Sequence, residues 1–235
     1  MGERPDPMEQ WYWPAGVEVP DVRGWPVSLR AGALVLRPLY RSDEAAWQAV
    51  RARNQAWLSP WDPTAPPEDQ PWHQTVAQMR RQQWRQARAG VALPWVLAWD
   101  AGWPTARTAE RRTRLIGSVS VFAIAYGAAR SASFGYWIDS EFAGRGLAPL
   151  GVALAMDYCL AVLRLHRLQV DVRPANAASL RVVAKLGLRA EGPKPRYLHI
   201  AGDWADHLAF ALDASEVDRP LTTRVLAGRP VPRQD

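Results

Sequence analysis

The stretch Phe134–Leu150, FGYWIDSEFAGRGLAPL, constrains the fold more than any other part of the chain. At its start, Phe134, Tyr136 and Ile138 fall on one face and Gly135, Trp137 and Asp139 on the other, which predicts a short strand. A glycine turn, Gly144-Arg145-Gly146, follows, and then an apolar helix with Pro149 in its first turn. Glycines and a helix N-terminus together direct backbone N–H groups at one point and favour an anion there. The stretch therefore predicts a phosphate- or pyrophosphate-binding turn, with a tight turn that binds nothing as the alternative.

Two common phosphate-binding motifs do not fit this turn. A dinucleotide fingerprint needs a third glycine after Gly146, and a P-loop needs Gly-Lys followed by Ser or Thr. The sequence has neither at this place. The predicted anion site is therefore of another type.

Length and composition limit the classes of protein that remain. A chain of 235 residues with 48% hydrophobic residues is long enough for one domain with extensions. We expect a cytoplasmic protein, because no apolar run has transmembrane length and the N-terminus, MGERPDPMEQ, lacks the layout of a signal peptide. The single cysteine, Cys159, excludes disulfide frameworks and cysteine-based zinc sites, and we expect no metal.

The chain carries an excess of positive charge. The net charge of +6 and the isoelectric point near 10.0 suit an acidic partner such as a ribosome or a nucleotide cofactor. Arginines scattered over helices explain the same numbers more simply. No nucleic-acid site is predicted from this charge.

Hydrophobic periodicity and turn residues divide the chain into three parts. Residues 1–31 are rich in proline and tryptophan, so we expect an irregular extension whose tryptophans strap it onto the domain. Residues 32–212 form the domain, and the polar tail 213–235 is expected to lie loosely on the surface. Strands are predicted at about 33–38, 93–100, 114–125, 134–139, 168–173, 196–200 and 204–212, and helices at about 42–58, 71–90, 148–163 and 177–186.

The order of these elements predicts an α+β fold. Strands and helices do not alternate regularly, so a mixed sheet with helices on both faces is favoured over a doubly wound one. The helix predicted at 148–163 is apolar on nearly every side, which indicates that it is buried against the sheet.

Two motifs, in register with this element order, resemble the GCN5-related N-acetyltransferases (GNAT superfamily). The motifs are A-G-R-G-L-A at Ala143–Ala148 and N-A-A-S-L-R-V-V-A-K-L-G-L at Asn176–Leu188, and the resemblance covers about residues 33–212. Within the superfamily, R-Y-L-H-I-A-G-D-W-A-D-H at Arg196–His207 and W-L-S-P-W at Trp57–Trp61 resemble the RimJ/RimL branch. That branch acetylates the N-terminal amine of ribosomal proteins.

The resemblance implies both a fold and a co-substrate site. The fold is a mixed, mostly antiparallel sheet of about six to seven strands, in which a splayed strand pair binds acetyl-CoA. The pantetheine arm lies between the two strands, and the pyrophosphate lies on the glycine turn. Ala143 and Pro149 depart from the family pattern of the turn. The implied acetyl-CoA-binding residues are Tyr136, Trp137, Ile138, Gly144, Arg145, Gly146, Leu147, Ala148, Asn176 and Ser179.

The resemblance also suggests catalytic residues. Ser179 matches a serine proposed in RimL-like enzymes to protonate the leaving thiolate, and Val183 stands where other family members have a tyrosine donor. A plain helix cap at Asn176 and a helix serine bonded to the backbone are the structural alternatives. Arg196 stands in place of a RimL-type glutamate, which leaves the general base open. The candidates are Glu141 or Tyr197, followed by His199, Asp203 and Asp206.

The predicted function is acetyl transfer from acetyl-CoA to an amine, and the expected acceptor is the N-terminal α-amine of a protein such as a ribosomal protein. One alternative is a small-molecule N-acetyltransferase that acts on an antibiotic or a polyamine. Another is a non-catalytic module that senses acetyl-CoA or docks on ribosomes. The sequence predicts no membrane partner and leaves both a monomer and a homodimer open.

Overall fold

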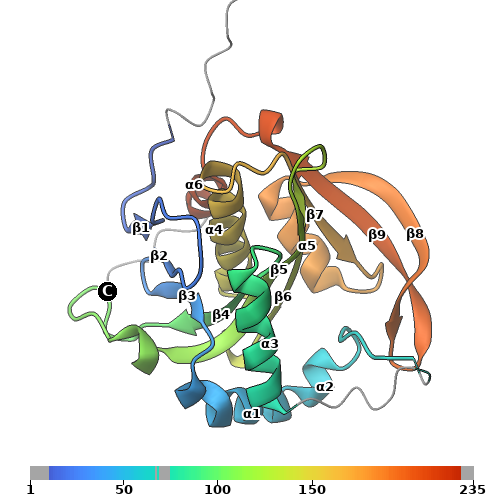
Figure 1. The fold of residues 1–235 in the computed structure, drawn as a ribbon, viewed down its shortest axis with the longest axis horizontal. Helices are drawn as coiled ribbons and strands as arrows, with labels where there is room; N and C mark the ends of the chain where they lie inside the picture. The colour runs from blue at the N-terminus through green and yellow to red at the C-terminus, as the bar shows by residue number, and fades with distance from the viewer. Residues whose placement is uncertain (1–10, 67, 69–74, 229–235) are drawn as a thin grey trace, which may run out of the picture.

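The computed structural model describes residues 11–66, 68 and 75–228, and its centre is one sheet with the strand order β1-β2-β3-β4-β5-β6-β7-β9-β8 (Figure 1). Neighbouring strands are antiparallel except β6 and β7, which run parallel. The strands are Val17–Glu18 (β1), Leu29–Ala31 (β2), Leu34–Pro38 (β3), Leu93–Trp99 (β4), Arg114–Ala125 (β5), Ser131–Ile138 (β6), Arg167–Val172 (β7), Arg189–Ile200 (β8) and Asp203–Asp213 (β9).

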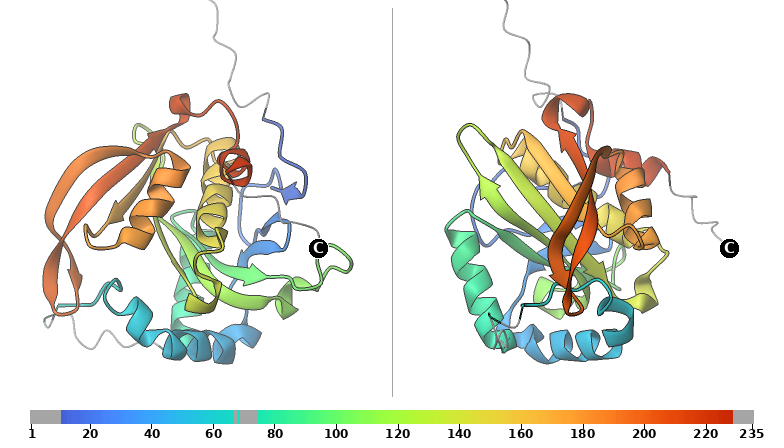
Figure 2. Two further views of the ribbon diagram at one scale, coloured as in Figure 1. Left: turned by 180° about the vertical axis from the view of Figure 1, so that it is seen from behind. Right: turned by 90° about the vertical axis from the view of Figure 1, so that its right-hand side faces the viewer.

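Helices cover both faces of the sheet, as the predicted α+β fold requires (Figure 2). Two helices of the first group pack against β4 and β5 around Val50, Val96 and Leu115, and the second group lies on the opposite face. The first group is Glu44–Arg53 (α1), Gln55–Leu58 (α2) and Val76–Arg88 (α3), and the second is Leu147–Ala161 (α4), Ala177–Leu186 (α5) and Leu221–Ala227 (α6). Short 3-10 turns occupy Arg41–Asp43, Glu110–Arg112, Ser140–Phe142 and Ala214–Glu216.

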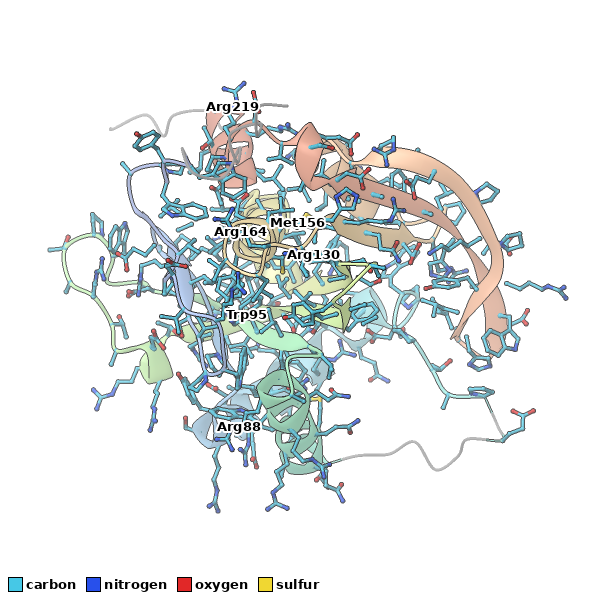
Figure 3. The ribbon with its side chains drawn as sticks, turned by 45° about the horizontal axis from the view of Figure 1, so that its top comes forward. Arg88, Trp95, Arg130, Met156, Arg164 and Arg219 are labelled. Atoms are coloured by element: carbon cyan, nitrogen blue, oxygen red, sulfur yellow. The ribbon has the colours of Figure 1, made fainter. Side chains whose placement is uncertain are left out.

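The helix α4 lies in the middle of the core, as its uniformly apolar sequence predicts. Nearly all of its residues are buried. Gly151 allows the close approach, because an added Cβ would lie 2.5 Å from the Leu97 side chain of β4. On the same side, Trp95 is fully buried and its indole donates to the carbonyl of Val27 at 2.8 Å. Trp95 and Met156 therefore lie inside the molecule in Figure 3, whereas Arg88 projects from α3.

The sheet has more strands than the six to seven expected, because part of the predicted irregular extension joins it. β1 and β2 pair with each other, and β2 continues the sheet along β3. Leu29 is 1% exposed, and Trp25 packs at 6.1 Å from Trp95, so a tryptophan does hold this segment against the domain. The strands are too short for a periodic pattern to reveal them. Residues 1–10 lie outside the described part of the chain.

The last hairpin is longer than predicted. β8 begins at Arg189, whereas the sequence indicated a strand only from Arg196. Pro193 and Pro195 hide the strand in the sequence, but β8 is an edge strand, where proline is tolerated. The tip of the hairpin reaches the segment after α2, where Pro63 and Ile200 form a β-bridge (Figure 1).

The expectation of a loose tail is wrong for residues 214–228. Helix α6 packs on α4 and α5, and Leu221 and Val225 are buried. The buried Asp157 carboxylate of α4 accepts hydrogen bonds from the backbone N–H groups of Leu221 at 2.7 Å and Thr222 at 3.0 Å. A side chain from the middle of the chain thus caps the last helix.

We predict that Asp157 makes stability depend on pH. Burial raises the pKa of its carboxyl to about 7, although the two backbone hydrogen bonds oppose the shift. The folded-state pKa lies above the unfolded value of about 3.9, so the protonated carboxyl contributes fully to stability below pH ~4. This contribution is lost as the pH rises to about 7 and the buried carboxyl ionises. In urea titrations, the free energy of unfolding of the wild type relative to Asp157→Asn should therefore fall across this range. The exposed Asp218→Asn is the control, and parallel pH curves for wild type and Asp157→Asn would contradict the prediction.

Candidate active site

The strands β6 and β7 pair only at their beginnings. Their register runs from Ser131 opposite Arg167 to Phe134 opposite Val170. Beyond Phe134, β6 stays paired with β5 and β7 stays paired with β9, so the two strands part. A cavity of about 750 Å³ opens where they separate. The splayed strand pair implied by the family resemblance is therefore present.

This cavity is lined from both faces of the sheet. Alternation along β6 sends Tyr136 and Ile138 toward the core beneath α4 and α5 and sends Trp137 to the other face. There the Trp137 ring packs edge-on at 5.4 Å from the Trp47 ring of α1. All three β6 side chains line the cavity. Two molecules can therefore meet in the gap after approaching from opposite faces.

The glycine turn has the geometry that the sequence predicted. Gly144 and Gly146 take left-handed conformations, with φ of 76° and 70°, and α4 starts at Leu147 directly after them. A Cβ built on Gly144 would have no atom within 4 Å, so this side of the turn is open. Ala148, in the first turn of α4, lines the cavity, which makes turn and cavity continuous.

Positive charge gathers beside the turn around the Phe142 ring. The guanidinium groups of Arg145 and Arg114 lie over this ring, 5.1 and 4.8 Å from its centroid. Arg114 also forms an ion pair with Glu141, and Arg53 lies 3.9 Å from the same carboxylate. Glu141, one of the two leading base candidates, is thus held by arginines and does not line the cavity.

The fully buried carboxylate of Asp139 holds the end of β6. It forms an ion pair with Arg53 and accepts a hydrogen bond from the Asn54 amide at 2.8 Å. Burial opposes the ionised form, but these bonds outweigh it and lower the pKa of the Asp139 carboxyl below its usual value. Trp57 of α2 adds a bond from its indole to the Ile138 carbonyl at 3.2 Å. The α1–α2 corner thus anchors the strand end that leads into the turn.

The first turn of α5 approaches the gap from the other side. Asn176 caps the helix, since its side-chain oxygen accepts the Ser179 N–H at 3.0 Å. Both residues line the cavity. The Tyr136 hydroxyl donates to the Ser179 carbonyl at 3.4 Å, and burial raises the pKa of Tyr136 to about 12, which keeps the phenol protonated. Val183 is buried in the core and offers no donor to the cavity.

The remaining base candidates lie on the last hairpin, and the structure brings only Tyr197 among them into the cavity lining. The Nδ1 atom of His199 lies 2.7 Å from the Thr64 hydroxyl. The carboxylates of Asp203 and Asp206 accept backbone N–H groups of the hairpin itself, at 2.7 and 2.8 Å.

His207 was not predicted as a site residue from the sequence, yet it lines the cavity. The alternation of residues along β9 was the available signal, but using it requires the register of β9 against β7. Within the described residues, no group of three or more histidine, cysteine or acidic side chains is arranged to hold a metal ion.

Comparisons with known proteins agree with this geometry. Residues 33–189 match the acetyltransferase (GNAT) domain family. The chain is 27% identical over 188 residues to the ribosomal protein uS5-alanine N-acetyltransferase of Escherichia coli, a match that covers 79% of this chain and 90% of that protein. It is 40% identical over 99 residues to YjcK of Bacillus subtilis, described as a probable N-acetyltransferase, but that match covers 42% of this chain and 55% of YjcK.

A solved structure extends the likeness to nearly the whole fold. Mycobacterium smegmatis RimJ, in complex with CoA-disulfide, superposes with a TM-score of 0.74 at 30% identity, over 87% of this chain and 95% of that one. The chain belongs to the GNAT acetyltransferase family. The predicted family, fold class and enzyme class, an N-acetyltransferase, are confirmed. No helix in the described ranges has the length and apolar character needed to cross a membrane.

We predict that Asn54 supports the site through the end of β6. Its amide donates to Val50 at 2.9 Å and to Asp139, and its oxygen accepts the Ser140 N–H at 2.9 Å. Asn54→Ala removes all three hydrogen bonds, although Asp139 keeps its ion pair with Arg53, so the free energy of unfolding should fall by about 1–3 kcal/mol. Calorimetry should also show weaker acetyl-CoA binding, because the turn loses an anchor. Gln55→Ala, at an exposed neighbouring position, is the control. Equal acetyl-CoA affinity in both variants would show that Asn54 does not support the glycine turn.

Proposed function

We propose that this chain transfers the acetyl group of acetyl-CoA to the N-terminal α-amine of a protein. The parting of β6 and β7 beside an open glycine turn is the observation that carries the proposal. The pantetheine arm lies in the gap along the backbone of Tyr136, Trp137 and Ile138. The pyrophosphate takes the N–H groups of Gly144, Arg145, Gly146, Leu147 and Ala148, where left-handed glycines and a helix N-terminus favour an anion.

The chemistry is nucleophilic attack of a neutral amine on the thioester carbonyl. The C–N bond forms, the C–S bond breaks, and the leaving thiolate takes a proton. Ser179 is our candidate donor, because it lies in the first turn of α5 and lines the cavity together with Asn176. An N-terminal amine has a pKa of about 7.7–8.0, so a substantial fraction is neutral at working pH.

The charges around the cavity favour a single amine over a polyamine. Of the residues that line the cavity, two are carboxylates, Asp62 and Asp171, and both are already paired with cations. Asp62 forms an ion pair with Arg51, and Asp171 lies 2.7 Å from the Lys194 ammonium. A polyamine needs free carboxylates for its several positive charges. The Escherichia coli relative, a ribosomal protein uS5-alanine N-acetyltransferase, supports an alanine-initiated acceptor, which this chain would meet in the cytoplasm.

A polyamine remains the second candidate because spermidine N(1)-acetyltransferase of Escherichia coli is 32% identical over 83 residues. That match covers only 35% of this chain and 45% of that protein. An antibiotic acceptor has no specific support in the cavity.

We predict that purified protein releases free thiol from acetyl-CoA with an alanine-initiated peptide but not with the same peptide blocked at its N-terminus. Spermidine should be acetylated at least tenfold more slowly, because the cavity carboxylates are neutralised. Mass spectrometry locates the acetyl group. Faster turnover of spermidine than of the peptide would show that the acceptor is a polyamine and not a protein N-terminus. Acetyl-CoA binding with no turnover on any amine would favour a non-catalytic module.

The position of the pyrophosphate is tested with two matched glycine variants. Gly144 and Gly90 have φ of 76° and 73°, and neither has an atom within 4 Å of an added Cβ, so Glu imposes similar backbone strain at both. Gly144→Glu places a negative charge in the anion site and should weaken acetyl-CoA binding at least 100-fold in calorimetry. Gly90→Glu, at the end of α3, should bind normally. Equal affinities would place the pyrophosphate elsewhere.

A further inference from the structure

His207 occupies an enclosed position at the end of the gap. It lies on β9, where Leu208 pairs with Val172, the last residue of β7, and where Lys194 of β8 pairs with His207 itself. The side chain is 3% exposed, yet it lines the cavity. An imidazole is therefore placed beside the gap between β6 and β7, just past the last residue of β7.

The register places this imidazole on one particular face of the sheet. Val170 and Val172 of β7 belong to the core beneath α4 and α5, so Asp171, between them, points to the opposite face. His207 is one residue from Leu208, which opposes Val172, and it shares the face of Asp171. Trp137 of β6 points to this face as well. The His207 ring thus faces away from α5, on the side of the gap opposite Asn176 and Ser179.

The hydrogen bonds of His207 define which nitrogen carries a proton. Nδ1 lies 3.0 Å from the Ala205 carbonyl oxygen. A carbonyl only accepts, so Nδ1 is protonated and donates, and Nε2 of the neutral ring keeps its lone pair. None of the described residues makes a hydrogen bond with Nε2. Burial lowers the pKa of the imidazole below its usual value, which keeps the ring neutral at neutral pH.

Two cations and one anion surround the ring. Asp171 and Arg173 face it from β7, and Lys194 faces it from β8. Lys194 is paired with Asp171, and the Arg173 guanidinium donates to the Pro60 carbonyl at 2.7 Å. From β8, the Tyr197 ring packs edge-on at 5.7 Å and fixes the plane of the imidazole. The ring is therefore held in one orientation without a carboxylate of its own.

We propose that Nε2 of His207 accepts the proton that the acceptor amine loses during acetyl transfer. The amine nitrogen forms the C–N bond, the C–S bond breaks to release the thiolate, and the N–H proton moves to Nε2, directly or through one water, and then to solvent. Asn176 and Ser179 lie on the α5 side of the gap, and His207 lies on the other, where the amine enters. This role rests on the acetyl transfer proposed above, but not on the identity of the amine.

The first experiment measures the tautomer and needs no acceptor. Nitrogen NMR of histidine-labelled protein, with the His207 signals assigned by their loss in His207→Gln, should show a neutral ring protonated on Nδ1 at pH 7.5. It should titrate below about pH 6.5, the ordinary histidine value. A ring protonated on Nε2 would overturn the proposal, because that nitrogen then has no lone pair to offer.

The second experiment uses the amine with the highest wild-type rate. His207→Gln should lower kcat about 100-fold, at the lower end of the range for general-base catalysis, while acetyl-CoA affinity stays within twofold. At pH values below the pKa of His207, log(kcat/KM) should fall with slope two in the wild type, because both the amine and His207 take up protons, and with slope one in the variant. The exposed His166→Gln is the matched control and should behave as the wild type.

Chemical rescue separates a base from a structural residue. Added imidazole should raise kcat of His207→Ala at least tenfold and should not change kcat of His166→Ala. Three results would each overturn the role of His207: a kcat within threefold of wild type, an unchanged slope of two, or a loss that imidazole does not restore. Absence of turnover with every amine would instead contradict the proposed acetyl transfer, and with it the role of His207 as base.

Discussion

The buried carboxylate of Asp139 is the interaction on which the site depends. It fixes the end of β6 to α1 through Arg53 and Asn54, while β7 follows β9. The sheet stays hydrogen-bonded on both sides of the gap, because β5 pairs with β6 and β9 pairs with β7. In the interior of the sheet, backbone polar groups are therefore left for a ligand between these two strands, and Asp139 leads through the short turn Ser140–Phe142 to the glycine turn.

The two faces of the gap carry different chemistry because a strand sends alternate side chains to opposite sides. On the α5 side lie a helix cap, a serine and a phenol that burial keeps protonated, all suited to bind a neutral amide arm or to donate protons. On the other side lie tryptophans, an imidazole and ion pairs whose charges are already matched. The proposed proton donor, Ser179, and the proposed proton acceptor, His207, thus lie on opposite faces of the sheet.

The parts of this architecture that depend on local chemistry were predictable from the sequence. The turn at Gly144–Gly146 and the cap at Asn176 each depend on residues that are close together in the sequence, and the structure has both. The parts that depend on distant pairing were not. β1 and β2 are too short to show a period, and the prolines of β8 conceal an edge strand. His207 was missed because its place follows from the register of β9 against β7, which no local pattern contains.

Tryptophan surrounds the gap, and this has a practical consequence. Trp47, Trp57, Trp61 and Trp137 all line the cavity, and Trp57 donates its indole N–H to the carbonyl of Ile138. Binding of the proposed substrates in the gap should change the polarity around these four indoles, whereas Trp95 is fully buried in the core. Ligand occupancy of the unlabelled protein can therefore be followed by intrinsic fluorescence, and replacing one indole at a time resolves which face of the sheet a given ligand enters.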